Sequence, residues 1–287
     1  MDIVLQSTPL FLTGVFLLGS LVGSFLNVVI LRIPPLLEFD WRSQCSELLE
    51  IEGEAPERPP GIVATRSKCP HCGHGIRPWE NLPVLSYLFL RGKCSSCGEK
   101  ISIRYPLVEL MTAILFTVVA WHFGPTLQTA SALVLTAFLV AMTGIDIDHQ
   151  LLPDNFTLPL MWGGILLSFW SVHTDLASSV IGAMAGYLAL WAVYHAFRLL
   201  TGKEGMGYGD FKLLAALGAW MGWQMLPLVI LLSSVVGAIV GIVLMATGKL
   251  NKDKPMPFGP FIATAGWIAL IWGEWIIDLY LGGSGFG

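Results

Sequence analysis

The sequence predicts an all-α polytopic membrane protein with about eight transmembrane helices and a small cytoplasmic module that resembles a zinc ribbon. Composition gives the first reason: 54% of the 287 residues are hydrophobic, the mean hydropathy is +0.69 and only 13% are charged. Soluble domains carry about 25% charged residues. The second reason is that apolar runs long enough to cross a bilayer recur along the chain without the polar face of a soluble helix. The third is two paired-cysteine motifs in its one long polar segment.

Eight apolar runs are the predicted spans, and the sixth is short for a full crossing. They cover residues 9–31, 105–122, 127–145, 155–172, 176–199, 211–223, 225–247 and 258–280. The first run is too long for the core of a signal peptide, and no lysine or arginine precedes it within Met1–Thr8. We therefore expect it to be a transmembrane helix with its N-terminus outside.

The distribution of basic residues supports this topology. With the N-terminus outside, the inside segments are 32–104, 146–154, 200–210 and 248–257, and all 16 lysines and arginines lie in them or within a couple of residues. Such a bias predicts that these segments face the cytoplasm. The net charge of −4 and the lack of a basic stripe outside one loop predict no nucleic-acid partner.

Three parts are expected: a first helix at 1–31, a cytoplasmic loop at 32–104 with the cysteine module at 69–97, and a membrane domain at 105–287. The loop begins with an acidic insert, Glu38–Pro60, to which we assign no chemistry. Its charge suggests attraction for a basic partner. The glutamates considered for this role are Glu47, Glu50, Glu52, Glu54 and Glu57.

The cysteine motifs in this loop predict a structural metal site. Cys69 and Cys72 form one Cys-x-x-Cys pair, and Cys94 and Cys97 form another. Between the pairs lie 21 residues, and each pair is followed by glycine. Two such turns supply a closed Cys₄ set, as structural zinc requires. Two disulfides are the alternative, but a reducing cytosol disfavours them, and iron is the main rival metal. Cys45 is left over as a free thiol.

Two aspartates occupy short polar breaks beside long apolar runs. Asp146 follows the run 131–145, and Asp210 comes at the end of Gly207-Tyr208-Gly209-Asp210, just before the sixth span. A carboxylate at a membrane helix end is costly to desolvate and marks a functional-site candidate. Two together fit an aspartyl dyad that shares one proton. Gly207 and Gly209 are expected to let the backbone bend and to leave room for an extended substrate.

Other charged residues near the dyad have simpler interpretations. Asp148 is expected to lie in solvent or to orient the loop, and Asp154 to be the N-cap of the following helix. Lys212 is expected to reach toward lipid phosphates. Glu109, about one turn inside the second span, needs a partner, either Arg104 or a backbone donor.

These motifs together resemble the bacterial type IV prepilin peptidase family. The first matching piece runs from Gly23-Ser24-Phe25-Leu26-Asn27 to Pro34, and the paired cysteines follow. The others are Ile145-Asp146-x-Asp148-His149, continuing to Leu151-Leu152-Pro153-Asp154, and Gly207-Tyr208-Gly209-Asp210-Phe211-Lys212. The resemblance covers nearly the whole chain in order.

The resemblance implies a bifunctional enzyme of type IV pili and type II secretion. It would remove the basic leader of a prepilin or pseudopilin after a glycine at the cytoplasmic membrane face. It would then methylate the new N-terminal residue, commonly Phe, with S-adenosylmethionine. The catalytic aspartates of the family map onto Asp146 and Asp210, and 105–287 becomes the protease domain. The methyltransferase site is not located by any motif, and the family places it near the first cytoplasmic segment and Gly23–Pro34.

Three alternatives stay open from the sequence. A proton-coupled transporter would need charges at the bilayer midplane and an inverted repeat. A membrane-anchored zinc scaffold explains the cysteines but not the paired aspartate loops. A peptidase without methylation is the third.

Overall fold

The computed structural model describes residues 8–50, 57–62, 66–248 and 256–283. Glu52 and Glu54 of the acidic insert lie outside these residues. The chain divides into two compact units, Met1–Thr129 and Ala130–Gly287, and each is described by itself. The functional boundary expected at residue 105 stays a prediction.

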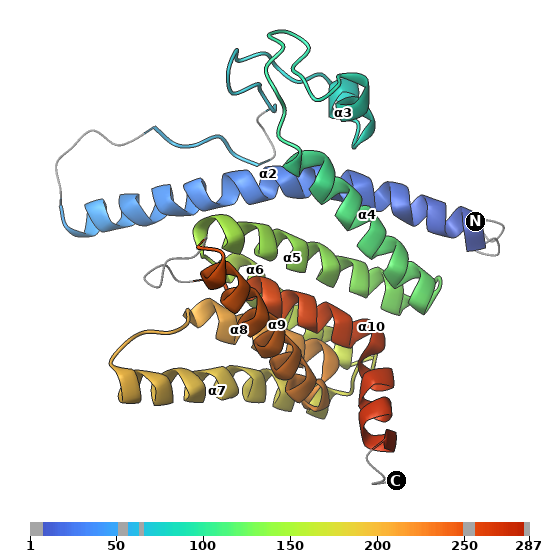
Figure 1. The fold of residues 1–287 in the computed structure, drawn as a ribbon, viewed down its shortest axis with the longest axis vertical. Helices are drawn as coiled ribbons and strands as arrows, with labels where there is room; N and C mark the ends of the chain where they lie inside the picture. The colour runs from blue at the N-terminus through green and yellow to red at the C-terminus, as the bar shows by residue number, and fades with distance from the viewer. Residues whose placement is uncertain (1–7, 51–56, 63–65, 249–255, 284–287) are drawn as a thin grey trace. The chain divides into compact units, whose positions relative to one another are not determined.

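Helices make up nearly all of the regular structure in the described residues (Figure 1). In the described residues, eight apolar helices correspond to the eight predicted spans. Two short helices, η1 (Pro78–Asn81) and α3 (Leu85–Phe89), lie in the loop between the first two of them. The apolar helices are α2 (Thr8–Leu48), α4 (Arg104–Phe123), α5 (Leu127–His149), α6 (Asp154–Ser168), α7 (Leu176–Thr201), α8 (Tyr208–Met221), α9 (Leu226–Ala246) and α10 (Gly259–Gly283).

Within the part of the chain that the structure describes, six helices are long and apolar enough to cross a bilayer: α2, α4, α5, α7, α9 and α10. The other two helices, α6 and α8, have 15 and 14 residues. The all-α polytopic class is therefore confirmed, and eight is an approximate count of true crossings. The short sixth span expected from the sequence is α8.

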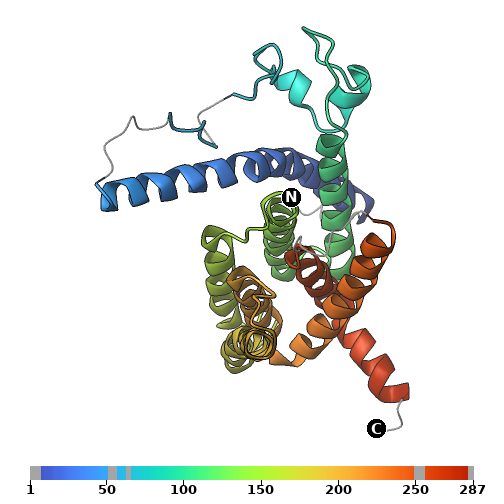
Figure 2. The ribbon, with the colours of Figure 1, turned by 60° about the vertical axis from the view of Figure 1, so that its left-hand side comes forward.

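The first helix is longer than the sequence predicts. The span was expected to close near residue 31, but α2 continues through Pro34 and Pro35 to Leu48 (Figures 1 and 2). Each proline removes one amide donor from the helical ladder. The residues that follow are mostly good helix formers, so the helix resumes its hydrogen bonding in the next turn. The first part of the acidic insert is therefore helical.

In the first unit, α2 and α4 cross at two glycines four residues apart. A methyl group on Gly19 would lie 2.7 Å from the Cα of Ala113, and one on Gly23 would lie 2.7 Å from the Cα of Glu109. Such a spacing of small residues lets two membrane helices approach closely. The side-chain amide of Asn27 donates to the carbonyl of Tyr105 at 3.1 Å one turn further along. This contact fixes the start of α4 against α2.

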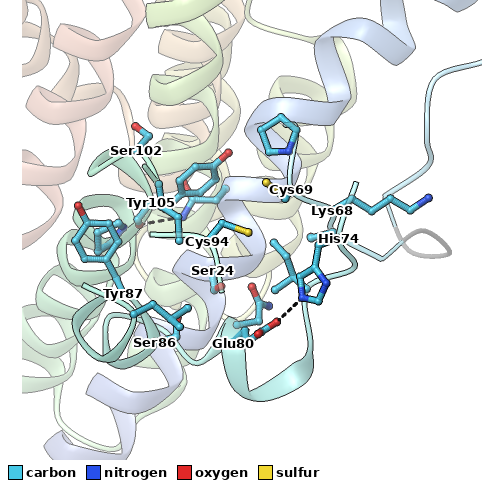
Figure 3. A pocket seen from close by; sticks show the side chains of 18 of the residues that line it. Ser24, Lys68, Cys69, His74, Glu80, Ser86, Tyr87, Cys94, Ser102 and Tyr105 are labelled. Carbon is cyan, nitrogen blue, oxygen red and sulfur yellow. Dashed lines mark hydrogen bonds and ion pairs between the residues drawn. The ribbon is translucent and has the colours of Figure 1, made fainter. Parts of the chain in front are cut away.

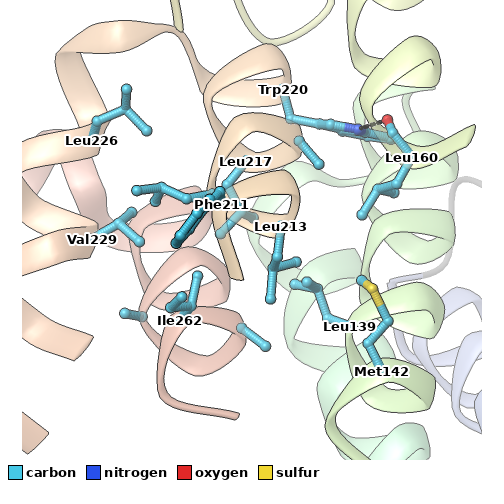
Figure 4. Close-up of a cluster of buried hydrophobic side chains, with 14 of the residues drawn as sticks. Leu139, Met142, Leu160, Phe211, Leu213, Leu217, Trp220, Leu226, Val229 and Ile262 are labelled. Atoms are coloured by element: carbon cyan, nitrogen blue, oxygen red, sulfur yellow. Dashed lines mark hydrogen bonds between the residues drawn. The ribbon is translucent and has the colours of Figure 1, made fainter. Parts of the chain in front are cut away.

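In the second unit, α8 is the central helix. All of its residues from Asp210 to Met221 are buried except Lys212, and its apolar side chains lie within the core cluster (Figure 4). Contacts with the backbones of α6 and α7 explain why α8 is so deeply buried. Gly182 of α7 meets Gly218 backbone to backbone, and the indole of Trp220 donates to the Leu160 carbonyl of α6 at 2.7 Å. Because α8 begins with Tyr208-Gly209-Asp210, this packing also holds Asp210 in place.

Candidate active site and metal centre

Four cysteine sulfurs gather at one point of the first unit. The ligand atoms of Cys69, Cys72, Cys94 and Cys97 all lie within 4.8 Å of one another, and no other such group occurs in the described residues. The Sγ atoms of Cys69 and Cys97 are 3.9 Å apart. A tetrahedral Zn–S distance of 2.3 Å implies sulfurs about 3.8 Å apart, so the cluster fits a structural zinc ion. The leftover Cys45 is free and exposed, as predicted.

Both cysteine pairs fold into the same turn. Gly73 and Gly98 have φ values of 70° and 74°, and their amides donate to the carbonyls of Cys69 and Cys94. Glycine is favoured here because a side chain strains the left-handed conformation. The turns also aim amides at sulfur: those of Cys72 and His71 lower the pKa of the Cys69 thiol to about 7. At Cys69 the turn geometry therefore favours the thiolate form that a metal binds.

In the second unit, Asp146 and Asp210 line one pocket of about 350 Å³. Asp146 is in the last turn of α5, and Asp210 is in the first turn of α8. Their exposed fractions are 5% and 7%, and the charge of Asp146 acts on Asp210. Two buried carboxylates that share a pocket favour an arrangement in which one is ionised and the other is protonated. The structure thus brings together the two aspartates that the sequence singled out.

A third element completes this pocket, and sequence reasoning missed it. The amide of Gly259, at the start of α10, donates to Oδ2 of Asp146 at 3.0 Å. A methyl group at Gly259 would lie 2.7 Å from the same oxygen, so this close approach requires glycine. The helix start also places positive partial charge beside the carboxylate. The available signal was Pro257-Phe258-Gly259-Pro260, a glycine between prolines at the start of an apolar run.

The two glycines before Asp210 do not form the backbone bend that the sequence predicts. Gly207 is the residue before α8, with φ −84°, and Gly209 lies inside the helix. Neither uses the left-handed conformation. Instead, a methyl group on Gly209 would meet Cβ of Leu152 at 2.7 Å. Glycine at 209 therefore lets α8 start directly against the loop that follows Asp146.

Two expectations for neighbouring charges were wrong. Asp154 does not cap α6, because Pro153 occupies the N-cap position and Asp154 is the first helical residue. Lys212 does not extend toward lipid phosphates, because its Nζ donates to both carboxylate oxygens of Asp154 at 2.6 and 2.8 Å. A pair from two helices satisfies both charges better than a local cap or lipid contact. Asp148 is exposed, as predicted.

Glu109 finds a backbone donor, which was one of its two expected partners. The amide of Val84, just before α3, donates to Oε2 of Glu109 at 2.7 Å. The contact holds the loop around α3 against the first turns of α4, because Glu109 lies five residues inside that helix.

Residues 17–123 match the family described as the bacterial peptidase A24 N-terminal domain. Residues 133–242 match the type IV leader peptidase family. The chain belongs to the type IV leader peptidase family. The two matched ranges correspond closely to the units that carry the cysteine cluster and the aspartate pair.

Full-length relatives agree with this membership. Proteins named prepilin leader peptidase/N-methyltransferase from Stutzerimonas stutzeri and Pseudomonas aeruginosa are each 54% identical, covering 96% and 98% of both chains. The protein of that name from Aeromonas hydrophila is 55% identical, covering 95% of this chain and 94% of its own. No solved structure matches the chain.

Proposed function

We propose that this protein is a prepilin leader peptidase and N-methyltransferase of the bacterial inner membrane, with Asp146 and Asp210 as its catalytic residues. The observation that carries the peptidase assignment is that two buried carboxylates, from the end of α5 and the start of α8, line one pocket. Relatives that match nearly the whole chain bear both activities in their name. A proton-coupled transporter has no comparable support.

The two aspartates have different roles in this proposal. Asp146 accepts the Gly259 amide, and an N–H donor stabilises the ionised form of a carboxylate. Asp146 is therefore the base that takes a proton from water, whose oxygen attacks the scissile carbonyl carbon. Asp210 holds the shared proton and gives it to the carbonyl oxygen. When the C–N bond breaks, the leaving nitrogen takes the proton from Asp146. Asp210 takes back a proton from one hydroxyl of the tetrahedral intermediate as the new carboxyl group forms, so both aspartates return to their starting states.

The substrate enters as an extended segment at the pocket mouth. Gly207 leaves open space there, since a methyl group on it would have only Oδ2 of Asp210 nearby, at 3.8 Å. The bias of lysines and arginines toward one set of segments supports a pocket that faces the cytoplasm. A prepilin has a basic leader ahead of an apolar helix, so its scissile bond would lie at that membrane face.

The cysteine cluster has a structural role. Cys69, Cys72, Cys94 and Cys97 would hold a zinc ion in a closed tetrahedral site, with no position for a substrate. Binding of the metal would fold a segment too small and polar to fold alone. S-adenosylmethionine supplies the methyl group for the new N-terminal nitrogen, and no Gly-x-Gly-x-x-Gly loop exists to bind it in the dinucleotide-binding manner.

One assay tests the whole proposal. Membranes that contain the protein are incubated with a prepilin and S-adenosylmethionine, and the product is examined by mass spectrometry. We expect loss of the leader and addition of one methyl group. Asp146→Asn and Asp210→Asn should abolish cleavage, and Asp148→Asn, two residues from Asp146 but exposed, is the matched control. If Asp146→Asn or Asp210→Asn still cleaves the prepilin, the assignment of these two aspartates as catalytic is wrong. If the product is cleaved but carries no methyl group, the protein is a peptidase without methyltransferase activity.

A further inference from the structure

The pocket of the aspartate pair carries charge of one sign. Among the described residues that line it, the charged side chains are Asp146, Asp210 and Glu204, and no lysine or arginine lies with them. The cavity of about 450 Å³ in the first unit differs, because side chains of both signs, such as Lys68 and Glu80, line it together (Figure 3). The peptidase chemistry uses the two aspartates, and it leaves Glu204 without a task.

Two contacts with α7 hold Glu204 at the pocket. The hydroxyl of Tyr194, a side chain only 3% exposed, donates a hydrogen bond to the Glu204 carboxylate. A methyl group on Gly205 would lie 2.9 Å from the ring of Phe197, so the loop that follows α7 runs directly against this helix. Glu204 therefore has a defined position, although its own side chain is exposed.

The charge of Glu204 is available to a ligand. Its basic neighbour in the described part of the chain is Arg198, whose Nη1 lies 3.9 Å from Oε1 of Glu204. The two side chains are 52% and 69% exposed, and an exposed pair at this separation is weak. A cationic side chain that enters the pocket can therefore replace Arg198 as the partner of Glu204.

The other side of the pocket is apolar. Residues 256–258 (Met, Pro and Phe), from the segment before α10, line it there. The two aspartates lie between this segment and the loop before α8, since Asp146 accepts the amide of Gly259 and Asp210 accepts that of Gly207. A peptide that crosses the pair would thus have an acidic group on one side of the cut and apolar side chains on the other.

This asymmetry matches a substrate that is basic before the cut and apolar after it. We propose that Glu204 determines leader specificity: its carboxylate pairs with a lysine or arginine of the leader and so sets the direction in which the chain crosses the two aspartates. An extended chain advances about 3.3 Å per residue, and a sphere of 350 Å³ is about 9 Å across, so this basic residue lies within about three positions of the scissile bond. The inference rests on the proposed peptidase function, and it adds the residue that recognises the leader.

Cleavage kinetics with two prepilins test this contact. One prepilin carries a lysine within the three residues before the cut, and in the other that lysine is replaced by glutamine. With purified full-length protein in detergent, Glu204→Gln should lower kcat/KM for the lysine prepilin about tenfold, mainly by raising KM. It should change kcat/KM for the glutamine prepilin by less than about twofold, because that substrate has already lost the contact. The ratio of the two values does not depend on how much of the variant folds.

A matched control separates a direct contact from general attraction between opposite charges. Asp148→Asn removes one negative charge at an exposed position outside the pocket lining, and both values of kcat/KM should stay unchanged.

The outcomes also separate this inference from the function on which it rests. If the unmodified protein cleaves neither prepilin, the peptidase function fails and the role of Glu204 fails with it. If it cleaves both equally well, or if Glu204→Gln lowers kcat/KM by the same factor for both, the peptidase function stands and Glu204 does not recognise the leader.

Discussion

The amide of Gly259 lies 3.0 Å from Oδ2 of Asp146. A residue at the start of α10 thereby becomes part of a carboxylate site formed mainly by α5 and α8. The contact orients Asp146 and stabilises its charge, as its proposed role as the base requires.

Gly259→Ala tests this contact. The added methyl group would lie 2.7 Å from Oδ2 of Asp146, so the carboxylate or the start of α10 must move. Because small displacements of catalytic groups are costly, we expect cleavage to fall about 100-fold. Initial rates of leader removal measure this. Gly163→Ala is the matched control, since its methyl group would meet only Trp220, at 3.9 Å. A fully active Gly259→Ala would show that the contact is dispensable.

The Lys212–Asp154 pair should position the start of α8 relative to α6. Both side chains are partly exposed, at 28% and 54%, so we expect the pair to contribute no more than about 1 kcal/mol to stability. Lys212 is two residues from Asp210, however, and Lys212→Gln should lower the cleavage rate about threefold to tenfold.

A charge swap distinguishes positioning from a general need for lysine. The double variant Lys212→Asp with Asp154→Lys should recover part of the cleavage rate lost by either single change. Rates are measured beside thermal unfolding, which should move little. If the double variant is as slow as the worse single variant, the pair does not act through its salt bridge.

Metal removal should separate the two activities. The unmodified protein should contain one zinc ion per chain by elemental analysis, and Cys97→Ser should lose it. We expect methylation to fall more than cleavage, because the cysteine cluster and the aspartate pair belong to different units. Cys45→Ser is the matched control, since Cys45 is exposed and outside the cluster. Unchanged methylation in metal-free Cys97→Ser would contradict the structural role.

His173 should make stability depend on pH. Burial lowers the pKa of this imidazole from 6.5 to about 4 in the folded protein, and Oγ of Ser131 lies 2.8 Å from its Nε2. Between these values the unfolded chain binds a proton that the folded chain does not. Stability should therefore fall as pH drops from about 6.5 toward about 4, by up to about 1.4 kcal/mol per pH unit.

Thermal unfolding in detergent across pH 4.5 to 8 measures this dependence. His173→Gln should unfold at a lower temperature at neutral pH if the Ser131 contact is lost, but its slope below pH 6.5 should be shallower. Equal slopes for the variant and the unmodified protein would assign the acid sensitivity to other groups.

The sequence was sufficient for features that depend on local pattern. Apolar length predicts the helices, the spacing of Cys69 to Cys97 predicts the metal cluster, and position at helix ends predicts Asp146 and Asp210. Contacts between distant residues were beyond it. Gly259 is 113 residues from Asp146 and looked like an ordinary helix start, and the Lys212–Asp154 pair spans 58 residues. The local sequence favoured Asp154 as a helix cap, but in the structure its carboxylate pairs with the distant Lys212.

The burial of α8 has a consequence for how the protein is made. A 14-residue helix is about 21 Å long, shorter than the roughly 30 Å hydrocarbon core, and its first turn carries Asp210. Such a segment is a poor substrate for insertion by itself. It is covered by α6, α7 and α10, and the first two are synthesised before it. During biogenesis, α8 therefore has to pack against α6 and α7 after these helices have entered the membrane. Asp210 reaches its final position only at that step.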